Sequence, residues 1–220
     1  MEFENDNQEN EQIDPDGWSL VFHPDIIRKS EFSSKINKYS FFQYDSNEAL
    51  HLSEKERSSI EDLLEKIVDE YSQKLDRHTQ SLIVSNIELF LDYCLRFYDR
   101  QFYSRTNLNN DTISKFERLL INYYQFDEAH QKGIPSVKYC AKQLNLSPNY
   151  LSDLLKRETG KTTLEHIHYF LIEKAKTSLL NSSDTVSGIA YSLGFEYPQH
   201  FSNLFKSKTG LSPKEFRYLN

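Results

Sequence analysis

The stretch IAYSLGFEYPQHFSNLFKSKTGLSPKEFR, residues 189–217, decides the fold because it is the second copy of an internal repeat. The copies match in two blocks, and the offset changes by one residue between them, where a turn is expected. The matching positions are Ala141, Leu144 and Leu146 with Ala190, Leu193 and Phe195, and then Leu151, Ser152, Leu154, Leu155, Lys156, Thr159 and Gly160 with Phe201, Ser202, Leu204, Phe205, Lys206, Thr209 and Gly210.

Each copy predicts a short helix, a tight turn and a second helix. Pro148 and Pro198 suit the first turn of the second helices, where the missing N–H of proline has no helical partner. Ser147 is a favourable N-cap for the first of them. Gly160 and Gly210 are typical of the position just after a helix ends. This order of elements is the helix-turn-helix arrangement.

The second helices are predicted to have an apolar inner face and a polar outer face. Ala141 and Ala190 are expected where two helices approach too closely for a larger side chain. The outer faces carry short hydrogen-bonding groups and lysines, which contact base edges and phosphates, although one such face alone is equally typical of a solvated helix. Two matched copies favour DNA binding. The expected base contacts are Asn149, Ser152, Gln199, Ser202 and Asn203, the expected phosphate contacts are Lys156, Arg157, Lys206 and Lys208, and Asp153 and His200 lie on the same faces.

One long helix over about 163–181 is predicted between the copies, opened by a capping box at Thr162 and Glu165. Its length of roughly 27 Å approaches the ~34 Å helical repeat of DNA. A rigid spacer of this length can place two helices in successive segments of the major groove. A final helix is predicted after the capping box at Ser212 and Glu215.

Residues 189–217 closely resemble the signature of the AraC-type bacterial transcription regulators, and the resemblance extends over about 135–219. Leu193-Gly194-Phe195, Phe205-Lys206, Gly210 and Ser212-Pro213 are all in register with that signature. The resemblance implies a mainly α-helical fold and a seven-helix DNA-binding domain, with two helix-turn-helix units joined by a linker helix. Relatives usually carry an effector-binding barrel and a helical dimerisation segment before this domain.

This chain differs from the family pattern in two respects. Little strand signal precedes WSLVFHPDII at residues 18–27, which resembles the last strand of such a barrel, so the barrel is expected to be largely absent. Asp153 stands where many relatives carry a basic residue. Its carboxylate either accepts a hydrogen bond from a cytosine amino group or repels the phosphates. Repulsion softened by pairing with Lys156 or Arg157 is the favoured reading.

The net charge of the chain changes sign just before the repeat begins. The net charge is −7, but residues 131–220 hold 12 bases and 7 acids, whereas residues 1–130 hold 14 bases and 26 acids. The change of sign falls in a predicted linker at 127–135 that contains Gly133 and Pro135. We therefore expect a disordered acidic tail at 1–17, a remnant strand plus helical connector or dimerisation segment at 18–130, and a DNA-binding domain at 131–220.

Helical patterns dominate residues 53–126, and the only strand signal before them is Trp18–His23. The capping box at Ser53 and Glu56 opens a helix to about Leu75. A second helix over 80–102 has two apolar faces, so it is either sandwiched in its own domain or part of a homodimer. A third helix, capped by Asp111, is expected to reach Phe126. The apolar seam that favours a homodimer consists of Ile83, Ile87, Phe90, Cys94 and Phe97, and a second face consists of Leu82, Leu89 and Tyr93.

Other functions find little support in the sequence. The sequence contains no run of 18 apolar residues that would predict a membrane span. The polar N-terminus does not resemble a signal peptide. Two cysteines predict reduced thiols in a cytoplasmic protein. No phosphate-binding loop or hydrolase motif occurs, and His166 and His168 point in different directions on a helix, so no enzyme, cofactor or metal site is expected. The sequence thus predicts a sequence-specific transcription regulator whose partner is double-stranded DNA, with the transcription machinery as a further partner. The alternative is a helical protein-interaction module with a weak or vestigial DNA-binding domain.

Overall fold

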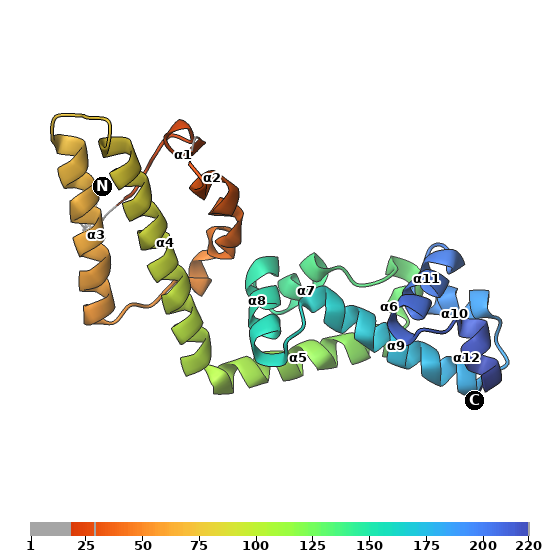
Figure 1. Ribbon diagram of the computed structural model, residues 1–220. Helices are drawn as coiled ribbons and strands as arrows, with labels where there is room; N and C mark the ends of the chain where they lie inside the picture. Colours follow the sequence, from red (N-terminus) through yellow and green to blue (C-terminus); the bar gives the residue numbers. More distant parts are fainter. Residues whose placement is uncertain (1–18, 29, 220) are drawn as a thin grey trace, which may run out of the picture.

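Two long helices, α4 (Thr79–Ser104) and α5 (Thr106–Gln125), follow one another and join the two halves of the molecule (Figure 1). The structure is a computed structural model, which describes residues 19–28 and 30–219. Within those ranges every regular element is a helix or a 3₁₀ turn, which confirms the mainly α-helical fold. The acidic tail predicted at residues 1–17 lies outside the described residues.

The N-terminal unit, residues 20–104, is built on a helical hairpin of α3 (Glu54–Ser72) and α4. The predicted capping box forms, since Ser53 accepts from the Glu56 N–H and the Glu56 carboxylate accepts from the Ser53 N–H. Short elements pack on α4 beside the hairpin: α1 (Asp25–Arg28), α2 (Phe32–Lys35), η1 (Ile36–Lys38) and η2 (Ser40–Gln43). They are followed by η3 (Ser46–Glu48).

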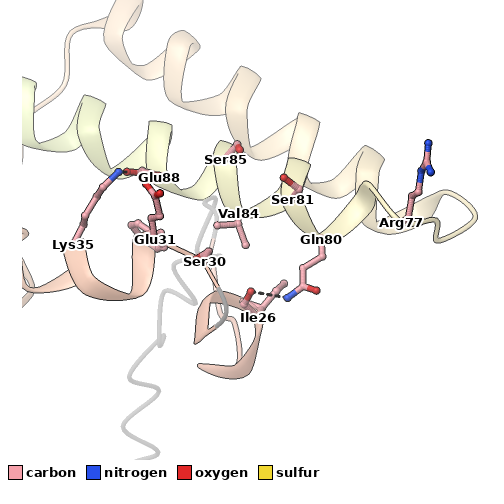
Figure 2. A pocket seen from close by; sticks show the side chains of 11 residues that line it. Ile26, Ser30, Glu31, Lys35, Arg77, Gln80, Ser81, Val84, Ser85 and Glu88 are labelled. Carbon is pink, nitrogen blue, oxygen red and sulfur yellow. Dashed lines mark hydrogen bonds and ion pairs between the residues drawn. The ribbon is translucent and has the colours of Figure 1, made fainter.

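The short helices α1 and α2 are attached to α4 by two polar contacts, which Figure 2 shows along a shallow pocket. Gln80 Nε2 donates to the Ile26 carbonyl over 2.9 Å, and Lys35 Nζ lies 2.9 Å from a carboxylate oxygen of Glu88. Both contacts are exposed, so apolar packing holds these segments in place more than the polar contacts do.

The strand predicted at Trp18–His23 is not formed, because Ser19–His23 has no neighbouring strand to which its backbone could bond. Trp18 itself lies outside the described residues. The alternating pattern behind the prediction is real, since Leu20 and Phe22 pack against the core while Val21 is 86% exposed. An extended segment lying on helices has the same two-residue period as a strand.

The apolar seam of α4 is part of the intramolecular core. Ile83 and Ile87 pack with Ile27, Phe32 and Ile67 of the same chain. Phe97 packs with Ile60 and Leu64 of α3. The seam residues Ile83, Ile87 and Phe97 are therefore buried within one chain, as the sandwiched alternative expects, and the homodimer through this helix stays a prediction.

The C-terminal core begins in α5, earlier than the sequence predicts. Phe116 and Leu120 of α5 belong to the same cluster as Leu151 and Ile167, so the predicted boundary at 127–135 falls inside this unit. The prediction that Asp111 caps the helix is wrong, because α5 begins at Thr106. Asp111 lies within the helix, where its carboxylate pairs with Lys115 at 2.6 Å.

Seven helices lie between Glu128 and Leu219, in agreement with the implied seven-helix domain. The linker helix α9 has the predicted bounds and the predicted capping box of Thr162 and Glu165. The capping contacts of Ser212 and Glu215 also form. The helices are α6 (Glu128–Lys132), α7 (Val137–Gln143), α8 (Pro148–Thr159), α9 (Thr163–Asn181), α10 (Val186–Ser192), α11 (Pro198–Thr209) and α12 (Pro213–Leu219).

The turns of the two repeats have the same geometry. In the first turn the Leu146 N–H donates to the Ala141 carbonyl, and in the second the Phe195 N–H donates to the Ala190 carbonyl, each over 3.0 Å. The residue before each donor has a left-handed backbone, which the structure gives to Asn145 (φ 56°) and Gly194 (φ 88°). Both alanines are completely buried between helices, as predicted.

Candidate nucleic-acid interface

The second helices of the two helix-turn-helix units, α8 and α11, are the recognition helices of this arrangement. Their inner faces are buried, as predicted. The buried side chains are Leu151, Leu154 and Leu155 on α8 and Phe201 and Phe205 on α11. Gly160 and Gly210 end them in left-handed conformations. The linker helix α9 has 19 residues and is about 28 Å long, so it holds the two units in a fixed relation.

The outer face of α11 is open to solvent. Gln199, His200 and Asn203 are exposed, and no part of the N-terminal unit covers them. Ser202 is half-buried, and its hydroxyl donates to the Pro198 carbonyl over 3.1 Å. The predicted phosphate contacts on this helix, Lys206 and Lys208, are also exposed. The structure therefore gathers all six predicted residues of α11 on one accessible helix.

The outer face of α8 is covered by the N-terminal unit. Figure 1 shows α8 beside α4, whereas α11 lies at the other end of the molecule near the C-terminus. Asn149 Nδ2 donates to Gln43 Oε1 over 2.9 Å, and η2 packs against the helix. Arg157 forms an ion pair with Asp99. Lys156 is exposed, and Ser152 is half-buried. The predicted residues of α8 therefore lie on one helix, but several of them are engaged by the N-terminal unit and are not free to contact DNA.

Asp153 has a different partner from the two that the sequence suggests. Its carboxylate accepts a hydrogen bond of 2.7 Å from the Tyr44 hydroxyl, while Arg157 is engaged with Asp99. Burial, and then the hydrogen bond to Asp153, raise the pKa of Tyr44 far above its usual value, so the phenol stays protonated and remains a donor. The expected pairing of Asp153 with Arg157 or Lys156 is therefore replaced by a contact to the N-terminal unit.

An aromatic cluster supports these polar contacts. Tyr150 and Leu154 of α8 are buried against Tyr98 and Phe102 of α4. The Tyr44 ring meets Tyr150 edge-on with a centroid distance of 5.2 Å. The contact between the halves thus has an apolar centre as well as hydrogen bonds.

Sequence reasoning missed Gln43, Tyr44, Glu48 and Asp99, which contact the first repeat from the N-terminal unit. The aromatic residues between Tyr39 and Tyr44 were the only signal, and they do not indicate which surface they cover. These contacts join residues 58 to 109 positions apart, and such contacts leave no periodic pattern in either segment. Such pairs become visible only in the folded chain.

Burial shifts the pKa values of several titratable groups outside this interface. Burial raises the pKa of Cys94 and of Cys140 to about 11, so both remain protonated thiols. Burial lowers the pKa of His166 and of His168, and the His166 ring lies 2.7 Å from the Thr159 hydroxyl. No group of three potential metal ligands occurs among residues 19–28 and 30–219. In the same part of the chain, no helix has both the length and the apolarity needed to cross a membrane.

Comparison with known proteins identifies the C-terminal half. A family model of the helix-turn-helix domain matches residues 140–218. The chain is 38% identical over 110 residues to the uncharacterized transcriptional regulatory protein YesN of Bacillus subtilis, covering 48% of this chain and 28% of that protein. It is 37% identical over 90 residues to the HTH-type transcriptional activator RhaS of Escherichia fergusonii, covering 41% and 32%. The chain therefore spans about a third of the length of these curated relatives.

Solved structures give a weaker likeness over the same region. The C-terminal domain of the response regulator yesN from Fusobacterium nucleatum is 28% identical, with a TM-score of 0.40 over 46% of this chain and 96% of that one. The C-terminal domain of AraT from Geobacillus stearothermophilus is 28% identical, with a TM-score of 0.39 over 46% and 84%. The family model, the two curated relatives and the paired turns agree on the same region, and residues 140–218 match a helix-turn-helix domain, in agreement with the resemblance to the AraC-type regulators.

Proposed function

We propose that the chain binds double-stranded DNA in a sequence-specific manner and regulates transcription. The observation that supports this best is the exposed outer face of α11, which belongs to one of two geometrically equivalent helix-turn-helix units. The names of the relatives describe a transcriptional regulator and an activator, and each covers much more than this chain. Regulation by the chain itself is therefore part of the proposal.

In this proposal α11 lies in the major groove. Gln199, Ser202 and Asn203 face base edges, and Lys206 and Lys208 lie along the phosphates. The excess of basic residues in the C-terminal half supports this orientation, since 12 bases and 7 acids occur over residues 131–220.

We expect the full chain to bind duplex DNA with a steep dependence on salt. If three to six phosphates are neutralised, log K against log salt should have a slope of about −3 to −5, because each phosphate contact releases condensed counterions. Fluorescence anisotropy measures this slope between roughly 50 and 200 mM salt, a range over which several phosphate contacts change the affinity by orders of magnitude. The labelled duplexes are selected from random DNA by repeated binding to the chain. A flat response, or no binding at the lowest salt, contradicts the proposal and favours a protein-interaction module.

Asn203→Ala is expected to weaken binding to the selected duplex by about 1–3 kcal/mol and to relax the base preference at one position. The amide is exposed on α11 and can pair with a base edge as both donor and acceptor. Asn122→Ala, the same substitution on the exposed side of α5, is the control and should leave both quantities unchanged. An equal loss on selected and random duplexes would show that Asn203 contacts the backbone rather than a base.

A further inference from the structure

We propose that residues 43–48 and Asp99 form a cover that competes with DNA for α8, so that this recognition helix enters a groove only after the cover has moved away. The inference rests on the proposed function and extends it. The two helix-turn-helix units are then unequal, with α11 ready to bind DNA and α8 held by the chain itself.

One end of the cover contacts the N-terminus of α8. The two carboxylate oxygens of Glu48 accept from the Ser147 N–H over 2.6 Å and from the Ser147 hydroxyl over 2.5 Å. Glu48 is only 2% exposed. The N-terminus of a helix is where a DNA phosphate would bind to free N–H groups. A carboxylate already occupies that position, and it would repel a second anion.

The cover then follows the outer face of α8. Gln43 bonds Asn149, Tyr44 bonds Asp153, and the Asp99 carboxylate pairs with Arg157. These three α8 side chains are among those expected to face DNA. Each is satisfied inside the chain, so DNA would have to replace every one of these contacts.

The major groove has no room for α8 and the cover together. An α-helix with its side chains is about 10–12 Å across, and the major groove is about 12 Å wide. The helix alone fills the groove. A helix that carries residues 43–48 against its outer face cannot enter it.

Asp153 favours the covered state. In the cover its carboxylate has a hydroxyl donor 2.7 Å away on Tyr44. In a groove the same carboxylate faces phosphates, and only the amino group of a suitably placed cytosine offers it a donor. A basic residue at this position would give the opposite preference.

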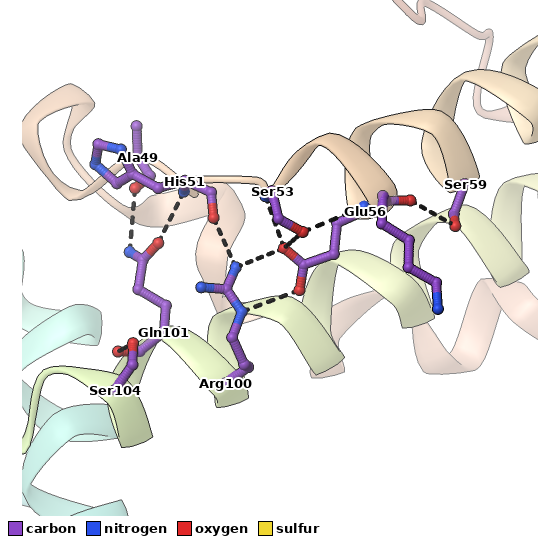
Figure 3. A network of polar contacts seen from close by, with 9 residues as sticks. Ala49, His51, Ser53, Glu56, Ser59, Arg100, Gln101 and Ser104 are labelled. Carbon is purple, nitrogen blue, oxygen red and sulfur yellow. Dashed lines mark hydrogen bonds and ion pairs between the residues drawn. The ribbon is translucent and has the colours of Figure 1, made fainter.

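The cover is anchored to α4 at its far end (Figure 3). Gln101, which is 2% exposed, donates to the Ala49 carbonyl over 3.2 Å and accepts from the His51 N–H over 2.7 Å. Arg100 donates to the His51 carbonyl and to both carboxylate oxygens of Glu56. The backbone after residue 48 is thus fixed, and uncovering α8 requires the N-terminal unit to swing away or residues 43–48 to detach.

The expected size of the effect follows from the population of the uncovered state. When only a fraction of molecules is competent, the apparent dissociation constant rises by the reciprocal of that fraction. A cover that is closed in nine molecules of ten or more weakens engagement of α8 by about tenfold or more.

The test compares two double variants of the full chain with identical substitutions. Tyr44→Phe with Glu48→Gln removes a hydroxyl and a carboxylate that contact α8. Tyr39→Phe with Glu88→Gln removes the same groups from contacts inside the N-terminal unit, where Tyr39 bonds Asp92 and Glu88 pairs with Lys35. Both variants change the net charge equally, so general attraction to DNA changes equally in the two.

We expect the first variant to bind selected duplex about tenfold more tightly, with a salt slope steeper by one to two phosphates, because the N-terminus of α8 and its basic residues become available. The second variant should change affinity less than twofold. Equal changes in the two variants, or no change in either, would overturn the proposal.

A third substitution shows whether the gain comes through α8. Asn149→Ala should weaken binding in the Tyr44→Phe, Glu48→Gln background and weaken it less, or not at all, in the wild-type chain, where the lost amide also held the cover through Gln43. An equal effect of Asn149→Ala in both backgrounds contradicts the cover.

Hydrogen exchange measured without DNA separates this proposal from the function on which it rests. The amides of residues 147–153 should exchange faster in the first variant than in the second, because the Ser147 N–H loses its carboxylate partner. If no variant binds DNA, the proposed function fails, whereas the exchange result still tests the cover. Unchanged exchange in the first variant would refute the cover whatever the DNA result.

Discussion

Gly194→Ala is expected to lower the free energy of unfolding by about 3 kcal/mol or more. Gly194 lies in the turn of the second helix-turn-helix with φ 88°, which itself costs an alanine about 1–2 kcal/mol. A Cβ there would lie 2.7 Å from the Gly133 carbonyl carbon and 2.9 Å from the Ile134 nitrogen. These are backbone atoms of the segment between α6 and α7, and they cannot rotate away as a side chain could.

Helix α5 holds both backbones that approach each other here. The Tyr123 hydroxyl donates to the Gly133 carbonyl over 2.9 Å, and the Tyr124 hydroxyl donates to the Leu193 carbonyl over 3.3 Å. Relief of the clash therefore has to break contacts to α5 as well. Because side chains from α5 to α12 share one apolar cluster, the loss of stability should extend over all these helices.

Gly160→Ala is the matched control. Gly160 has a similar φ of 77°, but a Cβ at this position meets no atom within 4 Å. It should therefore show the backbone strain alone, about 1–2 kcal/mol. Urea unfolding followed by circular dichroism measures both variants through their midpoints. Equal losses would show that the approach to residues 133–134 is not rigid.

Ile87→Asp should unfold the N-terminal unit, at a cost of more than 4 kcal/mol. Ile87 is 1% exposed and packs among apolar side chains from α1, α2 and α3. A carboxylate there loses the apolar contacts of isoleucine and has no partner for its charge. We expect a large loss of helical signal and rapid proteolysis within residues 20–104.

Leu89→Asp places the same charge two residues further along α4, where the side chain is 45% exposed. It should change stability by less than about 1 kcal/mol. Sedimentation of the two variants separates the two readings of the seam. If Ile87→Asp gave a folded monomer from a wild-type dimer, the seam would be an intermolecular surface. A monomer produced by Leu89→Asp alone would place self-association on the exposed face of α4.

Local features were predicted correctly from the sequence. The bounds of α9, the capping boxes at Ser53 and Thr162, and the left-handed glycines after α8 and α11 all follow from short-range rules. The repeat identified both helix-turn-helix units, because the same packing needs small residues and apolar faces at the same spacing. The resemblance to the AraC-type regulators extended this to the family of the domain.

Errors arose where a local pattern has more than one tertiary meaning. The alternation at Leu20 and Phe22 fits a strand or an extended segment on helices, and no neighbouring strand exists in the described chain to form the former. Asp111 is a good cap residue, but α5 continues past it because Phe116 and Leu120 bury the helix in the C-terminal core. The seam of α4 had two readings, and the packing of α1 to α3 decided between them.

The sequence by itself determined two helix-turn-helix units with equivalent outer faces, since each unit is encoded by contacts between near neighbours. Only the tertiary structure decided that these faces differ. The partners of Asn149, Asp153 and Arg157 come from residues 43, 44 and 99, more than fifty positions away. Such a contact depends on how two packed units meet at the junction of α4 and α5, and the periodicity of neither segment carries that information.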